Sequence, residues 1–270
     1  MPLAALALAL AAAVLHAIWN LLLAGSKDVE AATAVALPVS ALVVAPFAIV
    51  FWRVDAAAWP FIAASAGLEL VYFTFLAAAY RRSELSVVYP LARGLAPVFV
   101  LVGAVVVTGS GTTAQQVLGV LLVTGGVLFV RGLRRGRGVG FGLLIACCIA
   151  TYTVVDKHGV SHASPLAYLE VVTAAMGFGY CAAFTTVRGT APLRAAWGWR
   201  PVVAGLASFL AYGLVLWALQ LASAASVAAV RETGVLFATA LAAYFLKERV
   251  TPWRFAGAAL VVGGIALLAL

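Results

Sequence analysis

Residues 86–100 read SVVYPLARGLAPVFV, and they open an apolar run that continues to Val107. A run of about 20 apolar residues is long enough to cross a bilayer as a helix. Arg93 lies inside this run, and its guanidinium cannot become neutral by losing a proton. Placing an arginine near the bilayer centre costs roughly 2.5–3.5 kcal/mol, so such a side chain usually faces protein or water. The stretch therefore predicts a membrane-spanning helix with a polar environment at Arg93.

The same stretch carries a tyrosine and two prolines around the arginine. Tyr89, Arg93 and Pro97 are spaced by four residues, which places them on one face of a helix. Pro90 and Pro97 each remove a backbone donor and leave a carbonyl without its usual partner. Membrane helices tolerate such carbonyls where neighbouring helices or a wet cavity satisfy them. One interpretation is a helix that lines a polar pathway; the alternative is that Arg93 pairs with a neighbour such as Glu69 and serves assembly only.

The composition places the whole chain in a membrane. Of its 270 residues, 65% are hydrophobic and only 10% are charged, whereas a soluble domain carries about 25% charged residues. The net charge of +8 does not indicate nucleic-acid binding, because most Lys and Arg residues lie between apolar segments. Cys147, Cys148 and Cys181 all lie in apolar runs without the spacing of metal ligands, so we expect no metal and no cofactor.

Hydropathy and polar breaks predict an all-α polytopic membrane protein with ten transmembrane helices. The predicted segments are residues 3–24, 31–52, 58–80, 86–107, 114–131, 139–156, 165–187, 200–221, 224–246 and 252–270. Short connections make consecutive helices antiparallel neighbours. The first segment has no basic stretch before it, which favours a retained helix over a secretory signal.

The basic residues in the connections predict the orientation. Ten spans place both termini on one side of the membrane. The connections after the first, third, fifth, seventh and ninth segments carry thirteen Lys and Arg residues, and the other connections carry only Arg53 and Lys157. Because cytoplasmic loops are enriched in Lys and Arg, both termini are predicted outside and the linker at residues 131–138 is predicted in the cytoplasm.

An internal repeat divides the chain into two units. Seven residues recur at a separation of 140: Trp59, Tyr72, Ala78, Ser83, Ser86, Val87 and Gly94 match Trp199, Tyr212, Ala218, Ser223, Ser226, Val227 and Gly234. Residues 119–126 also match residues 257–264, at a separation of 138. We predict two five-helix units, 1–135 and 136–270, and the odd number of spans makes the second inverted relative to the first. Inverted repeats are the architecture of secondary transporters, with the substrate site near the midplane.

Several polar side chains lie within the predicted spans. The free-energy cost of burying ionisable groups in a membrane must be offset by ion pairing or by a role in the function of the protein. We expect substrate to contact Arg93, Tyr89, His16, Trp19, Asn20 and Arg231. Burial disfavours the charged form of a carboxyl, so Glu69 or Glu232 is the expected carrier of a coupling proton. The hydrolytic motifs HExxH and GxSxG are absent, as is any paired Asp-rich motif, so no enzyme activity is expected.

Three stretches carry a family resemblance. They are residues 15–20 (LHAIWN), the stretch Tyr89–Pro97, and residues 245–253 (FLKERVTPW) followed by Gly257 and Gly263-Gly264. With these motifs the chain resembles ten-helix members of the drug/metabolite transporter superfamily that are built from two EamA-type repeats. The resemblance covers essentially the whole chain, although the Lys-Glu-Arg turn has no counterpart in the first repeat. It implies a helical bundle whose central cavity carries amino acids, small metabolites or drugs, often together with protons.

These features predict a secondary transporter in the inner membrane of a bacterium. Its partners would be the lipid bilayer, protons and a small polar substrate, an amino acid or another carboxylate- or phosphonate-bearing solute, and no nucleic acid. We expect Arg93 to bind the anionic group, because a planar guanidinium fork suits bidentate contact. The alternatives are a multidrug or cation exporter of the same superfamily, a non-transporting membrane assembly factor, and a membrane-embedded enzyme.

The predicted orientation can be tested with reporter fusions. Alkaline phosphatase fused after Arg137 should be inactive, because that linker is predicted in the cytoplasm, and phosphatase fused at Leu270 should be active outside. Green fluorescent protein at the same two positions should give the reverse pattern. Cytoplasmic fluorescence from the fusion at Leu270 would refute the orientation.

Overall fold

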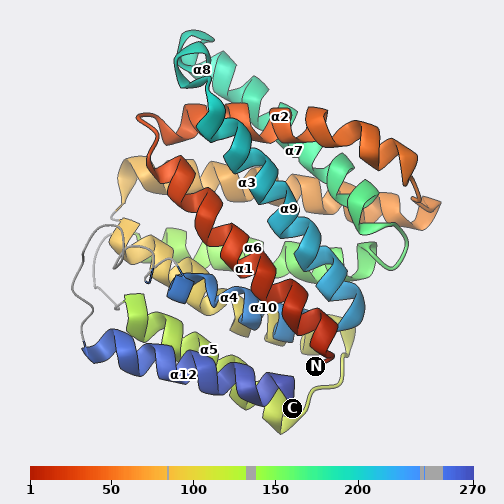
Figure 1. Ribbon diagram of the computed structural model, residues 1–270, viewed down its shortest axis with the longest axis vertical. Coiled ribbons are helices and arrows are strands. Elements are labelled where there is room, and N and C mark those ends of the chain that lie inside the picture. The colour runs from red at the N-terminus through yellow and green to blue at the C-terminus, as the bar shows by residue number, and fades with distance from the viewer. Residues whose placement is uncertain (84, 132–137, 238–239, 241–251) are drawn as a thin grey trace.

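The computed structural model describes residues 1–83, 85–131, 138–237, 240 and 252–270. Its elements are almost all helices (Figure 1): α1 (Leu3–Ala24), α2 (Val29–Val50), the short 3₁₀ helix η1 (Ala56–Ala58), α3 (Trp59–Arg82), α4 (Leu85–Thr108), α5 (Ala114–Arg131), α6 (Val139–Gly159), α7 (Pro165–Arg188), α8 (Ala191–Ala196), α9 (Trp199–Leu221), α10 (Ala224–Arg231) and α12 (Pro252–Ala269). The prediction of an all-α protein is confirmed.

Eight helices in the described ranges are long and apolar enough to cross a membrane. The predicted fifth segment coincides with a shorter apolar helix, Ala114–Val130. The predicted ninth segment begins as α10, but residues 238–239 and 241–246 lie outside the described residues, as does the turn of Lys247, Glu248 and Arg249. The protein is therefore a multi-pass membrane protein. The count of ten spans and the inverted repeat stay predictions.

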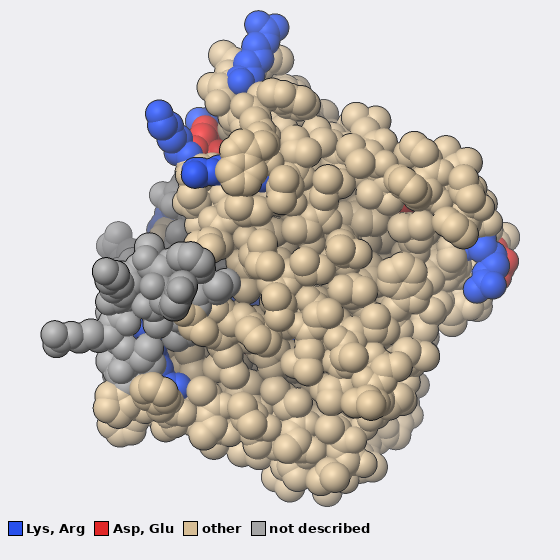
Figure 2. Space-filling view, viewed as in Figure 1, with Lys and Arg blue, Asp and Glu red and all other residues tan. Residues whose placement is uncertain are grey.

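The connections after α1 and α7 meet at one end of the bundle, here called the basic end. There Arg188 Nη2 lies 2.8 Å from Asp28 Oδ2, and Arg200 Nη1 donates to the Gly25 carbonyl at 3.3 Å. Figure 2 shows Lys and Arg side chains at the top and left of the molecule, another charged group at the right edge, and a broad uncharged surface between them. This distribution fits a hydrocarbon belt with charges at both of its borders.

At the opposite end, the connections after α2 and α6 pair with each other. Val54 and Ala163 form an isolated antiparallel bridge. The two chain termini also lie side by side (Figure 1), since the Met1 ammonium donates to the Leu268 carbonyl at 2.7 Å. Both termini therefore emerge at the same end, as an even number of spans requires.

The helices pack in pairs that come from different halves of the chain. α5 packs along α12, α2 packs against α7, and α1 packs against α9 while α3 packs against α6. The buried face of α1 is almost entirely alanine, including Ala5, Ala9, Ala12 and Ala13. In a membrane no hydrophobic driving force brings helices together, so their association depends on van der Waals contact. Small side chains increase this contact because they let the helices approach closely.

The closest approach joins α5 and α12 through glycines. A Cβ atom on Gly126 would lie 2.5 Å from the Gly257 carbonyl oxygen, and one on Gly257 would lie 2.7 Å from the Gly126 oxygen. Gly119 and Gly264 form a second such pair, with the corresponding distances at 3.1 and 2.7 Å. Because these obstacles are backbone atoms, a side chain cannot be accommodated by a rotamer change.

The change Gly126→Ala should therefore force α5 and α12 apart. We expect a loss of about 1–3 kcal/mol in stability, as for overpacked cores, measured by thermal unfolding of the purified protein in detergent. Gly125→Ala is the matched control, since a Cβ at the neighbouring position meets nothing within 4 Å. Equal destabilisation by the two changes would contradict the proposed contact.

Candidate functional site

A cavity of about 820 Å³ opens at the basic end of the bundle. We call it the wide cavity. Its mouth is lined by Lys27, Asp28, Glu30 and Arg188. Three of these groups form ion pairs near the surface: Arg188 pairs with Asp28, and Arg188 Nη1 lies 3.3 Å from Glu30 Oε2. Exposed pairs of this kind contribute only about 0–1 kcal/mol, so they impose little resistance to movement at the mouth.

A second cavity of about 100 Å³ continues from the inner end of the wide cavity. We call it the deep cavity. The two cavities share eight lining residues: His16, Trp19, Leu37, Tyr72, Phe73, Arg93, Gly205 and Ser208. The deep cavity adds four residues with ionisable side chains: Glu69, Tyr152, Tyr212 and Arg231. The path therefore narrows from an aromatic chamber onto a small, charged one.

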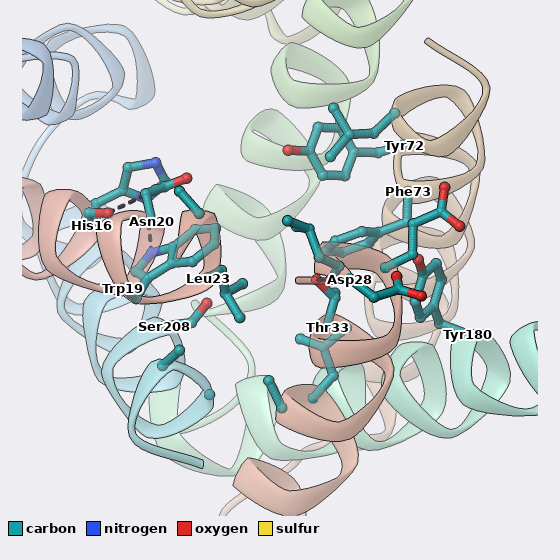
Figure 3. Close-up of a pocket in the computed structure, with 18 of the residues that line it drawn as sticks. His16, Trp19, Asn20, Leu23, Asp28, Thr33, Tyr72, Phe73, Tyr180 and Ser208 are labelled. Carbon is teal, nitrogen blue, oxygen red and sulfur yellow. Dashed lines mark hydrogen bonds between the residues drawn. The ribbon is translucent and has the colours of Figure 1, made fainter. Parts of the chain in front are cut away.

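Three residues of α1 predicted to bind substrate form one wall of this path (Figure 3). Trp19 Nε1 donates to His16 Nδ1 at 3.2 Å, and Asn20 Nδ2 donates to the His16 carbonyl at 2.7 Å. The bond from Trp19 requires an unprotonated Nδ1, so the ring proton of a neutral His16 lies on Nε2. Tyr72, Phe73 and Tyr180 face this wall from the other side of the cavity (Figure 3).

Arg93 reaches both cavities from α4 and is buried. Gly94 lets α4 approach α5, since a Cβ there would lie 2.5 Å from Leu128 Cδ2. Pro97 removes the donor that would pair with the Arg93 carbonyl. The Arg93 guanidinium lies 3.2 Å from the carboxyl of Glu232. The ion pair found for Arg93 therefore joins α4 to the end of α10. Tyr89 also belongs to α4, but its side chain is outside the described residues.

The predicted ninth span is interrupted where it meets this ion pair. α10 ends at Arg231, and residues 232–233 form a turn in which the backbone N–H groups of Glu232 and Thr233 donate to the carbonyls of Ala229 and Val230. Such a break within a membrane helix is tolerated where the backbone borders protein or a cavity. It places Arg231 in the last turn of a helix, where a positive charge is favoured by the helix dipole.

Glu69 of α3 also faces the deep cavity. Its carboxyl makes no hydrogen bond among the described residues, and it is 9% exposed. Asp156 and Arg231 lie close enough for their charges to act on it. The structure thus brings together Arg93, Arg231, Glu69 and Glu232, which are far apart in the sequence.

Asp156 is a buried charged group that the sequence analysis did not single out. Its carboxyl accepts hydrogen bonds from Tyr168 at 2.8 Å and from Tyr212, and it is completely buried. Gly159 permits this arrangement, because a Cβ there would overlap the Tyr168 ring. The predicted sixth segment ended at residue 156, whereas α6 continues to Gly159, so Asp156 lies inside the helix. One sign in the sequence was the internal repeat, in which Tyr212, a donor to Asp156, matches Tyr72.

The opposite end of the bundle is held together by buried polar contacts. Asp156 with its two tyrosines joins α6, α7 and α9. Nearer the surface, Lys157 Nζ donates to the Leu219 and Ala222 carbonyls, which are at the C-terminal end of α9 and attract a cation. The wide and deep cavities are thus accessible from the basic end.

In a comparison with protein families, the EamA-like transporter family matches residues 136–270. A search of curated proteins gave no match. Among solved structures, one described only as "Crystal structure of protein" is 15% identical, with a TM-score of 0.78 over 98% of each chain. At that identity the likeness shows a shared fold.

The Asp156 contacts yield a stability prediction. Tyr212→Phe removes one of two donors to a buried carboxylate, which should cost about 1.5–3 kcal/mol and lower the melting temperature of the purified protein. Tyr152→Phe is the matched control, because Tyr152 contacts Tyr212 through its ring and its hydroxyl makes no hydrogen bond within the described ranges. If the Tyr212→Phe protein has the same melting temperature as the wild type, the hydrogen bond from Tyr212 to Asp156 does not contribute to stability.

Proposed function

The chain belongs to the EamA-like transporter family, and from this premise we propose that it is a secondary transporter that works by alternating access. It moves a small polar metabolite, an amino acid or another solute with a carboxylate or phosphonate group. The observation that carries this proposal is the path from the basic end, which narrows onto four buried ionisable side chains: Arg93, Arg231, Glu69 and Glu232. Polar groups at membrane depth mark substrate and ion pathways.

We propose ten spans in two inverted units, residues 1–135 and 136–270. The helix contacts support this arrangement, because exchanging the units maps one set of contacts onto another. The contact of α1 with α9 corresponds to that of α6 with α3, and the contact of α4 with α6 corresponds to that of α10 with α1. The glycine pair of Gly126 and Gly257 likewise corresponds to that of Gly264 and Gly119. The family match also begins at residue 136.

In this proposal, the anionic group of the substrate binds at the guanidinium side of the site. Arg93 borders both cavities and therefore meets a solute that enters from the wide one. Arg231 lies further in, and Trp19, His16, Asn20 and Tyr89 complete the contacts. The predicted orientation makes the basic end cytoplasmic, so the cavity of this structure would face the cytoplasm of a bacterium.

The energy source in this proposal is an ion gradient, with Glu69 or Glu232 carrying a proton. Both carboxyls are buried, and acidic side chains at membrane depth often serve as proton relays. Replacing the responsible glutamate by Gln should abolish accumulation driven by a proton gradient and leave exchange partly intact. The idea fails if Glu69→Gln and Glu232→Gln proteins both still concentrate substrate.

A multidrug exporter is the second candidate, and the aromatic lining of the wide cavity favours it. Trp19, Phe73 and Tyr180 offer flat apolar surfaces to a hydrophobic solute. Arg93 and Arg231 at the deep cavity weigh against this candidate, because their guanidiniums favour a solute with an anionic group. A membrane enzyme or an assembly factor would not exchange labelled solute at all.

Counterflow in proteoliposomes tests the proposal. Vesicles loaded with an unlabelled metabolite should take up the same labelled metabolite when the protein is present. Arg93→Lys should insert and fold, yet bind an anionic substrate about tenfold more weakly or worse, since Lys lacks the bidentate fork. Arg194→Lys is the control, because Arg194 is exposed on α8. Unaltered affinity in a folded Arg93→Lys protein would remove Arg93 from the site.

A further inference from the structure

Two opposite charges in the deep cavity lack hydrogen-bond partners among the described residues. The first is Arg231, which is 3% exposed. Its Nε and Nη2 atoms are buried and make no hydrogen bond within the part of the chain that the structure describes, and Nε lies 3.9 Å from the nearest Glu232 oxygen. A guanidinium offers five N–H donors, and leaving buried donors unmatched costs free energy. This edge of Arg231 therefore lacks an acceptor.

The second unmatched charge is Glu69. The other carboxyls of the cluster have donors or counter-charges close by: Glu232 lies beside Arg93, and Asp156 accepts from Tyr168 and Tyr212. Glu69 lines the same deep cavity as Arg231 and makes no hydrogen bond among the described residues. In the same cavity, the Glu69 oxygens therefore lack a hydrogen-bond donor and the Arg231 guanidinium lacks an acceptor.

We propose that the deep cavity binds the charged head of a zwitterion, with the carboxylate on Arg231 beside Arg93 and the ammonium on Glu69. This inference rests on the proposed transport function and narrows its substrate class to amino-acid-like solutes. A cavity of about 100 Å³ accommodates the two charged groups and the carbon between them, whereas the pockets that hold drug-sized ligands measure about 300–1,000 Å³. The remainder of the solute extends into the wide cavity, between Trp19 and Phe73.

The charge balance of the cluster favours a zwitterion over a simple anion. Two guanidiniums, Arg93 and Arg231, stand against three carboxyls, Glu69, Asp156 and Glu232, so the ionised cluster has one negative charge in excess. A solute with only a carboxylate would add to that excess in a place of low dielectric constant. A solute with only an ammonium would leave the Arg231 donors unmatched. A zwitterion satisfies both groups and adds no net charge.

The test uses the full-length protein in lipid nanodiscs and measures affinity by calorimetry. The twenty protein amino acids, β-alanine and taurine are screened first. The tightest binder is then compared with its deaminated acid and its decarboxylated amine, for example L-leucine with 4-methylpentanoate and 3-methylbutylamine. Each analogue should bind about 10- to 100-fold more weakly than the zwitterion, the effect of one lost charged hydrogen bond.

Variants assign the two groups separately. Glu69→Gln should weaken the zwitterion about 10- to 100-fold and leave the acid analogue unaffected. Arg231→Lys should weaken the zwitterion and the acid, and leave the amine unaffected. Glu170→Gln is the matched control: this glutamate is also buried with an unpartnered oxygen, but it lines neither cavity, so affinity should not change.

Several outcomes would overturn the inference: no zwitterion binds, an acid or amine analogue binds as tightly as its zwitterion, or folded Glu69→Gln protein keeps full affinity. Counterflow separates this failure from failure of the proposed function. Exchange of simple acids or amines without exchange of zwitterions would remove the inference and leave a transporter. Absence of exchange for every solute in the panel would remove both.

Discussion

Burying a guanidinium in a membrane protein costs free energy that its surroundings must offset. Among the described residues, two arginines are buried in this way, Arg93 and Arg231. The Arg93 charge is matched by Glu232, at 3.2 Å. Breaking a buried ion pair by removing one partner typically costs about 3–5 kcal/mol, because the remaining charge is left uncompensated. The close approach of α4 to the end of α10 follows from this requirement. So does the interruption after Arg231, which places two oppositely charged neighbours at the border of a cavity.

The fold class could be read from the sequence because the membrane imposes length and composition on every span. The helix bounds agree closely with the predicted segments, for example Leu3–Ala24 against 3–24 and Pro165–Arg188 against 165–187. The short helix α8 was missed, since Ala191–Ala196 is too brief for hydropathy to separate from a loop. The break after Arg231 was missed because residues 224–246 contain no proline and read as one apolar run.

The members of the buried charged cluster could be read from the sequence, but their pairing could not. Arg93, Arg231, Glu69 and Glu232 stand out as charges in apolar runs, and the structure brings all four to one place. Their pairing depends on which helices are in contact. From the sequence alone, Glu69 on the neighbouring segment was the candidate partner of Arg93. The ion pair found instead joins α4 to α10 across the two halves of the chain. Asp156 escaped notice because charged residues near a predicted span end are ordinarily solvated.

The two ends of the bundle differ in the contacts that hold them, and the difference bears on how a carrier of this design would close. The mouth is held by exposed ion pairs at Arg188, which are individually weak. The opposite end is held by the buried contacts of Asp156, which are strong only while water is excluded.

Closing the mouth over the cavities would isolate the charged cluster from water. With Glu69 ionised and unmatched, that step would seal an excess negative charge in a low-dielectric interior, at a cost of several kcal/mol per uncompensated ion. A proton or an ammonium on Glu69 removes the excess, so closure becomes favourable when the site is occupied. In the proposed function, the unmatched carboxyl would thereby couple occupancy of the deep cavity to the change of access.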